Sequence, residues 1–327
     1  MMGGRTEGKK LLPVIKAKTA GLILLLILAF TLSFSEGASP APSGGHVSVT
    51  GGFRVPDGEY ASVGAMVLGD PRPLPDEYDF ASDLAFAFCS STLIAPNVVL
   101  TAAHCLRAGK LYRYPTVVFG KNGKKGLLDS GPGIRRRVKS IAVNPHYSKS
   151  RTYGDVGLAF LSRPVTTIEP MRIGQPGVDP EPSFKDVVAS AGWGISSFKG
   201  IIAAFGFMGP NLKIAWGHAA GPSACQKKSR FIGEHQLCMT GAKRFGSICD
   251  GDSGGPLALL DDRGGDATYA SRKLEPLRLV GVNSDVIYPR KGEGCTHKAI
   301  DLFQSMAPSS PLNSWVRRTL AGRGIGI

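Results

Sequence analysis

Short apolar and β-branched runs, each bounded by turn-forming residues, recur along the chain after residue 48. Runs of this length with Gly, Pro, Asn or Asp at their ends favour β-strands. We therefore expect strands at residues 61–68, 91–100, 116–119, 138–143, 156–161, 187–191, 256–260 and 277–282. Only residues 311–320 read as a helix, in which Trp315, Val316 and Leu320 can pack and Asn313 or Ser314 can cap the start. The pattern predicts an all-β protein with a C-terminal helix.

Three segments interrupt the strand pattern in different ways. Residues 38–48 have no periodicity, which is typical of a short flexible propeptide. Residues 164–182 are rich in Pro and Gly and predict a connection between two domains. Residues 261–272 are charged and glycine-rich, so we expect an exposed hairpin loop there.

The first 37 residues have the composition of a secretory signal peptide. Basic residues from Lys9 to Lys18 precede an apolar run over 21–30, and small residues follow at Ser35, Gly37 and Ala38. An uncleaved membrane anchor is the alternative, but the apolar run is short for a bilayer span of about 20 residues. We expect residues 1–37 to be removed and the protein to be secreted, with no membrane attachment afterwards.

Composition and charge narrow the class of protein further. The chain has 43 glycines and 23 prolines, an excess that favours tight turns. Its formal net charge of +14 would attract an anionic surface. The basic residues are scattered, apart from 135–137 and 227–228, and no nucleic-acid motif accompanies them, so we predict no nucleic-acid partner.

Six cysteines follow the signal segment, which suits an oxidising compartment. Their number alone leaves many pairings open. None has the C-x2-C spacing of a zinc site, and we predict neither a metal nor any other cofactor.

The strongest chemical signal is the stretch Gly-Asp-Ser-Gly-Gly-Pro at residues 251–256. A serine hydroxyl becomes a nucleophile when a base takes its proton and nearby donors stabilise the oxyanion. The glycine at 251 lets its own N–H and that of Ser253 point into one small hole. His104, within Thr-Ala-Ala-His-Cys at 101–105, is a candidate base, and Asp155 is a candidate acid to orient it.

These three motifs together resemble the trypsin/chymotrypsin-like serine proteases. Further segments match that family in the same order, namely residues 49–54, 89–105, 144–147 and 191–194, and Trp315. The resemblance implies two antiparallel Greek-key six-stranded β-barrels, residues 49–172 and 173–327, with the active site in the cleft between them and a C-terminal helix.

The same resemblance implies a role for each site residue. Ser253 would attack the scissile carbonyl, His104 would carry the proton and Asp155 would hold the imidazole. The N–H groups of Gly251 and Ser253 would form the oxyanion hole. The implied disulfides are Cys89–Cys105, Cys225–Cys238 and Cys249–Cys295.

The way in which members of this family are activated implies roles for two further residues. Proteolysis would free the amino group of Val49, which would pair with Asp252 and order the oxyanion hole. Ser48 rather than Arg or Lys precedes Val49, so trypsin-like self-activation is disfavoured. Another activating protease is expected, or else self-cleavage with relaxed specificity. The alternative is that Val49 is an ordinary strand residue.

Specificity is implied by four positions: the pocket floor at Ser247 and the walls at Ser284, Val286 and Ala299. Ser247 is not acidic, so cleavage after Arg or Lys is disfavoured. Val286 would shorten the pocket and favour small or medium aliphatic residues. Asp285 is the alternative determinant, reading a basic residue at a neighbouring subsite.

The sequence thus predicts a secreted serine endopeptidase, made as a zymogen, that hydrolyses protein or peptide substrates through an acyl-enzyme. Two alternatives remain open. One is a catalytically silent cationic binding homologue, and the other is an esterase or acyl transferase with the same triad.

Overall fold

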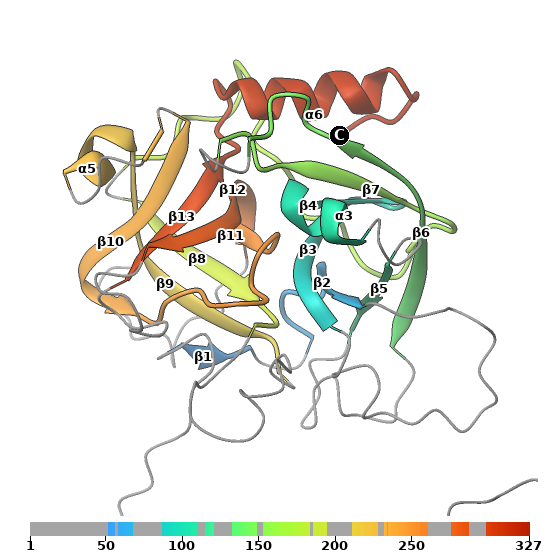
Figure 1. The fold of residues 1–327 in the computed structure, drawn as a ribbon, viewed down its shortest axis with the longest axis horizontal. Helices are drawn as coiled ribbons and strands as arrows, with labels where there is room; N and C mark the ends of the chain where they lie inside the picture. Colours follow the sequence, from blue (N-terminus) through green and yellow to red (C-terminus); the bar gives the residue numbers. More distant parts are fainter. Residues whose placement is uncertain are drawn as a thin grey trace, which may run out of the picture. The chain divides into compact units, whose positions relative to one another are not determined.

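Six antiparallel strands close the first barrel in the order β2-β3-β4-β7-β6-β5 (Figure 1). They are β2 (Val63–Val67), β3 (Ala87–Ala95), β4 (Val98–Thr101), β5 (Thr116–Phe119), β6 (Ile134–Val143) and β7 (Gly157–Leu161). Their apolar side chains form a core that includes Met66, Leu93, Val117, Phe119 and Leu161.

The computed structural model describes residues 52–55, 58–67, 87–109, 115–120, 133–148, 153–183, 186–194, 211–227, 232–233, 235–260, 276–287 and 299–327.

The second barrel runs in the order β9-β10-β13-β12-β11-β8 and is closed by pairing of β8 with β9. Its strands are β8 (Val187–Gly192), β9 (Lys213–Ala220), β10 (Gln236–Phe245), β11 (Pro256–Leu260), β12 (Pro276–Ile287) and β13 (Ile300–Ser305). The short strand β1 (Phe53–Arg54) pairs with β9, so the start of the described chain lies on the second barrel. The predicted pair of six-stranded barrels is therefore confirmed.

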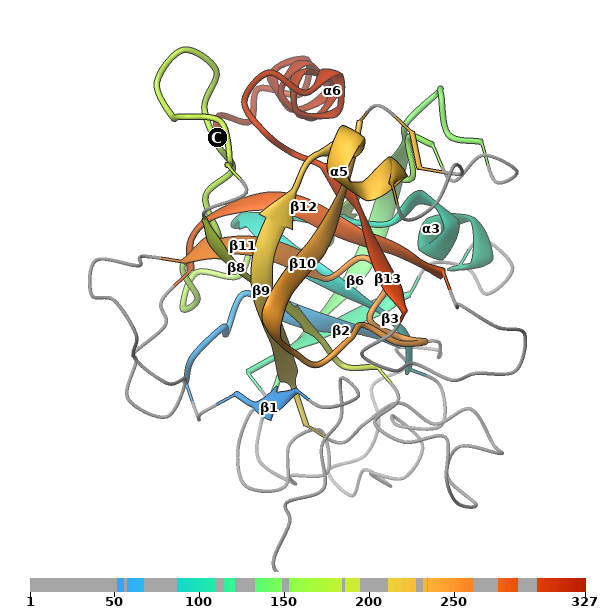
Figure 2. The same ribbon diagram turned by 90° about the vertical axis from the view of Figure 1, so that its left-hand side faces the viewer.

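The described helices are α3 (Ala103–Gly109), α5 (Pro222–Gln226) and α6 (Pro311–Ala321) (Figure 2). The predicted C-terminal helix is confirmed, but its predicted cap is wrong. Pro311 occupies the first turn, and the Ser310 hydroxyl accepts a hydrogen bond from the Leu312 N–H. Asn313 lies inside the helix, where its amide donates to two backbone carbonyl groups. Within the described residues, no helix is long and apolar enough to cross a membrane.

Most of the predicted strands are present, but residues 91–100 form two strands instead of one. Ala95 pairs with Val98 across a turn made of the exposed Pro96 and the half-buried Asn97, so β3 and β4 make a tight hairpin. Apolar residues flank Pro96 and Asn97 on both sides, so the sequence pattern predicts one continuous strand here. The signal peptide 1–37, the propeptide 38–48 and the loop 261–272 lie outside the described residues.

One apolar cluster joins the two barrels. It contains Leu100, Leu158 and Phe160 from the first barrel, Trp193, Ile214 and Val282 from the second, and Leu312, Val316 and Leu320 from α6. Contacts between β4 and β12 and between β2 and β8 lie along the same boundary. This shared core fixes the loops of one barrel against the loops of the other, which is where the candidate site residues lie.

Candidate active site

His104 and Asp155 are brought together by neighbouring strands of the first barrel. The pairing of Thr101 with Gly157 joins the end of β4 to the start of β7, and the two site residues lie just beyond these positions. His104 Nδ1 is 2.7 Å from Asp155 Oδ2, and the His104 backbone N–H donates to Asp155 Oδ1 at 2.8 Å. Asp155 is 3% exposed, whereas the imidazole is 36% exposed.

This geometry sets the state of the imidazole. An ionised carboxylate only accepts hydrogen bonds, so Nδ1 of His104 must carry a hydrogen toward Asp155. In the neutral ring the other nitrogen, Nε2, then has a lone pair that can accept a proton. The Ser284 hydroxyl also donates to Asp155 Oδ2, at 2.8 Å, and so helps to hold the carboxylate.

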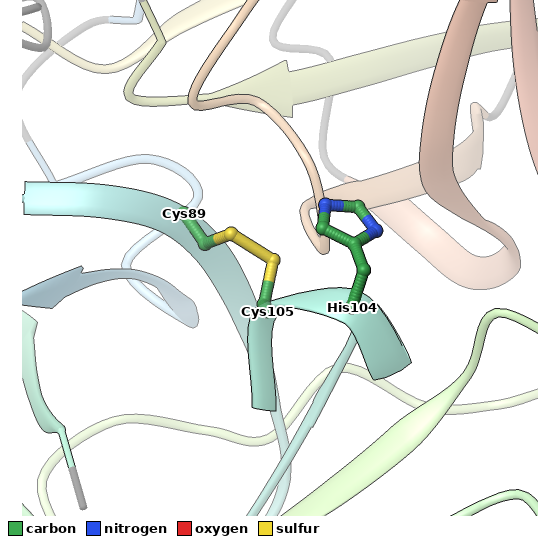
Figure 3. A group of neighbouring side chains, drawn as sticks. All are labelled: Cys89, His104 and Cys105. Atoms are coloured by element: carbon green, nitrogen blue, oxygen red, sulfur yellow. A yellow bond between two sulfur atoms is a disulfide. The ribbon is translucent and has the colours of Figure 1, made fainter. Parts of the chain in front are cut away.

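Ser253 is tied to the turn that carries His104. Its carbonyl accepts from the Ser90 N–H at 2.8 Å. Ser90 follows Cys89, which forms a disulfide with Cys105, the residue after His104 (Figure 3). One backbone hydrogen bond and one disulfide therefore link the predicted nucleophile of the second barrel to the predicted base of the first.

Two glycines beside Ser253 adopt conformations that other residues reach only with strain. Gly251 has φ +92° and Gly254 has φ +86°. A Cβ on Gly254 would overlap the Thr101 hydroxyl. The Gly251 carbonyl accepts from the Ser90 hydroxyl at 2.9 Å, which holds the peptide group just before Asp252.

The Asp252 carboxyl is fully buried behind Ser253. It accepts from the Gly194 N–H and from the Cys249 N–H, each at 2.8 Å. Burial raises the pKa of Asp252 to about 7, and nearby Asp301 and Asp250 act in the same direction, while the two backbone donors oppose the shift. A buried carboxyl of this kind is suited to receive a cation. Val49, predicted to supply that cation, lies outside the described residues.

Residues 76–316 match the family model described as Trypsin. The chain belongs to the trypsin family.

The chain is similar to serine proteases of insects and mammals. It is 30% identical to serine protease Hayan of Drosophila melanogaster over 268 residues, which are 79% of this chain and 37% of Hayan. It is 30% identical to the chymase of Cavia porcellus over 191 residues, 58% of this chain and 71% of the chymase. Trypsin theta of Drosophila melanogaster is 27% identical over 274 residues, 83% of this chain and 95% of that protein. The chain thus spans little more than a third of Hayan but nearly all of trypsin theta.

The disulfides of this trypsin-family chain agree with two of the predicted pairs. Cys89–Cys105 and Cys225–Cys238 are both present. Cys249 is also disulfide-bonded, and its predicted partner Cys295 lies outside the described residues. In the part of the chain that the structure describes, the one group with metal-ligand potential is Cys89, His104 and Cys105. The disulfide occupies both sulfurs, so this group has no thiolate to offer a metal.

The predicted pocket residues lie on the second barrel, and two of them have partners that the sequence did not reveal. Ser247 is buried and donates to Asp301 Oδ1 at 2.6 Å, and the Ile248 N–H donates to the other carboxyl oxygen at 3.2 Å. The Ser284 hydroxyl, expected in the pocket wall, is directed at Asp155 instead. Ala299 is buried.

Sequence reasoning missed four residues of the site: Ser90, Ile248, Asp301 and Gln304. Asp301 and Gln304 are fully buried on β13. Polar residues in an otherwise apolar strand carry a signal, because a buried polar group requires a partner. Their partners lie far away in sequence and could not be named in advance.

Proposed function

We propose that this protein is a serine endopeptidase in which Ser253, His104 and Asp155 form the catalytic triad. The observation that carries this proposal is the pairing of His104 Nδ1 with the buried Asp155 carboxyl at 2.7 Å. It leaves Nε2 as the basic nitrogen of a partly exposed imidazole, and Ser253 is linked to the same segment through Ser90 and the Cys89–Cys105 disulfide. Family membership and the named serine proteases among its relatives support the same activity.

In the reaction, Ser253 Oγ bonds to the scissile carbonyl carbon while its proton passes to His104 Nε2. Asp155 stabilises the imidazolium that results, and its two bonds to His104 keep the ring from turning. The imidazolium then protonates the leaving amine as the C–N bond breaks. Water then attacks the acyl carbon and gives a proton to His104 Nε2. His104 returns this proton to Ser253 Oγ as the acyl C–O bond breaks.

The oxyanion formed in this reaction would be held by the N–H groups of Gly251 and Ser253. The positive φ of Gly251 and the bond from the Ser90 hydroxyl to its carbonyl support this assignment, because both restrict the peptide groups around the nucleophile. The buried carboxyl of Asp252 anchors the same loop from behind.

A serine-directed phosphonate probe tests the proposal directly. We expect the active chain to be labelled on Ser253, as located by peptide mapping, and Ser253→Ala to stay unlabelled. A silent binding homologue would show no labelling in the wild type. Matched peptide and ester substrates then separate an endopeptidase from an esterase, since the esterase would hydrolyse only the ester.

The substrates are proteins or peptides with a small or medium aliphatic residue before the scissile bond. Val286 is partly buried and packs against the cluster that contains Ile248. The Asp301 carboxyl accepts from Ser247 and from the Ile248 backbone, so both of its oxygens have donors within the protein. The packing of Val286 against this apolar cluster is the contact that supports the preference for aliphatic residues.

Replacing Val286 with glycine should therefore widen the preference. We expect kcat/KM for a Phe substrate to rise about tenfold or more relative to a Val substrate, because methylene-scale changes in a hydrophobic pocket are worth about 1–3 kcal/mol. The measurement uses peptides that differ only at the residue before the scissile bond. Val178→Gly, at a position 68% exposed, is the control. An unchanged ranking for Val286→Gly would place the pocket elsewhere.

We also propose that the protein is secreted as a zymogen. Removal of residues 1–37 and 38–48 would leave a mature chain that starts at Val49, with the barrels at residues 49–172 and 173–327. The buried Asp252 supports this route, because its carboxyl would gain from pairing with a new amino terminus. An activating protease is then a partner, and the excess of positive charge favours an anionic surface as another.

A further inference from the structure

Gln304 connects the second barrel to the segment of the first barrel that carries Asp155. It lies on β13, where its backbone pairs with Val282 of β12 and Gln236 of β10, and it is fully buried. Its Oε1 accepts from the Gly154 N–H at 3.1 Å, and its Nε2 donates to the Ser284 hydroxyl at 3.2 Å. One amide group thus bonds both to Gly154, which precedes Asp155 in sequence, and to Ser284, which donates to the Asp155 carboxylate.

The directions of these hydrogen bonds follow from chemistry. The Gly154 N–H can only donate, so the amide atom that faces it must be Oε1. That leaves Nε2 facing Ser284, and an amide nitrogen donates but does not accept. Ser284 must therefore accept from Gln304, and its own hydrogen is directed to Asp155 Oδ2 at 2.8 Å.

The Gly154 side of this bridge is constrained as well. Gly154 has φ +67°, and a Cβ there would lie 2.9 Å from the Asn144 amide nitrogen. Its carbonyl accepts from that amide at 3.1 Å, while its N–H goes to Gln304. Gly154, the residue just before Asp155, is therefore held at its N–H by the second barrel and at its carbonyl by the first.

We propose that Gln304 is a positioning residue for the catalytic acid, acting on Asp155 through the Ser284 hydroxyl and the Gly154 N–H. This inference rests on the proposed function. Gln304 touches neither the substrate nor His104 in this role. It orients the hydrogen of Ser284 and fixes the backbone before Asp155, so that the carboxylate keeps its place against His104 Nδ1.

The test compares Gln304→Met with the matched control Gln236→Met in the full chain, activated in the same way as the wild type. Gln236 is equally buried and is the strand partner of Gln304, but its Oε1 accepts from the Gly233 N–H instead of the Gly154 N–H. We expect Gln304→Met to lower kcat about tenfold with little change in KM, because bonds that support a charged group are worth more than neutral ones. Gln236→Met should lower stability but leave kcat and KM unchanged.

A double-mutant cycle shows whether the effect passes through Ser284. Gln304→Met should lower kcat much less in a Ser284→Ala background than in the wild type. Losses that simply multiply would overturn the route through Ser284, and a kcat that stays unchanged in Gln304→Met would overturn the whole proposal. A wild type without hydrolysis would instead overturn the proposed function.

Gln304→Glu keeps the test decisive if the methionine variant does not fold. A carboxylate at this position still accepts from the Gly154 N–H but cannot donate to Ser284. It would draw the Ser284 hydrogen away from Asp155, so kcat should fall at least as far as in Gln304→Met. Burial would raise the pKa of the new carboxyl, so kcat is measured up to a pH at which that carboxyl is ionised. A folded Gln304→Glu variant that keeps wild-type kcat there would also overturn the assignment.

Discussion

Asp155→Asn is expected to lower kcat by about 10⁴-fold while leaving the fold intact. The wild-type carboxylate accepts from the His104 N–H, from His104 Nδ1–H and from the Ser284 hydroxyl. An asparagine has one carbonyl oxygen and one NH2 group. If the oxygen keeps the backbone N–H of His104, the NH2 group faces Nδ1, and the ring hydrogen must move to Nε2. His104 can then no longer take the proton of Ser253.

The measurement is kcat with a peptide substrate, alongside urea unfolding to show that the variant is folded. Asp186→Asn is a suitable control, because that carboxylate accepts from the Ser183 N–H and lies away from the triad. It should keep wild-type kcat. A loss of less than tenfold in Asp155→Asn would show that Asp155 does not set the tautomer of His104.

Much of this site could be predicted because its residues lie in short sequence motifs. The stretch at 251–256 combines a serine with glycines, and the structure gives Gly251 and Gly254 the positive φ that such a turn requires. The Cys89–Cys105 disulfide likewise joins two segments whose motifs are both local. Barrel strands such as β5 and β11 have the alternation or apolar runs that strand prediction depends on.

The rest depended on contacts between distant segments. Strand β13 was missed because Asp301 and Gln304 interrupt its apolar run, although both are buried and hydrogen-bonded. Strands β9 and β10 were missed for a related reason: they mix small and polar residues and lack a clear alternation. The direction of the Ser284 hydroxyl depends on a register shift between Asn283 and Asp285, which no local pattern reveals.

The stability of the unprocessed chain is expected to fall as the pH rises from about 4 to about 7, because of Asp252. Burial raises the pKa of Asp252 to about 7, whereas the unfolded value is about 3.9. Between these values the folded state holds a proton that the unfolded state has released, so raising the pH favours unfolding. A difference of this size amounts to roughly 4 kcal/mol across the range.

The measurement is urea unfolding between pH 4.5 and pH 8 of the intact chain carrying Ser253→Ala, which prevents self-cleavage. Asp252→Asn in the same background is the comparison, since asparagine does not ionise, although its NH2 group cannot accept from the Gly194 or the Cys249 N–H as a carboxyl oxygen does. The asparagine variant should be the less stable protein near pH 4.5, because one backbone N–H loses its acceptor. Its stability relative to the chain that keeps Asp252 should then rise as the pH increases toward 8. Subtracting one curve from the other removes the ionisable groups that do not interact with Asp252. Lys213 is not among them, because burial lowers its pKa to about 8 while the Asp252 carboxylate acts to raise it.

A stability difference that stays constant across this range would show that Asp252 is already compensated in the precursor. The expected slope has a functional meaning, because an uncompensated buried carboxyl is what a new amino terminus at Val49 would stabilise. Processing should then flatten the dependence on pH, since an ammonium partner lowers the pKa of Asp252 and keeps it ionised. The free energy that destabilises the precursor at neutral pH would thus help to order the loop that carries Gly251 and Ser253.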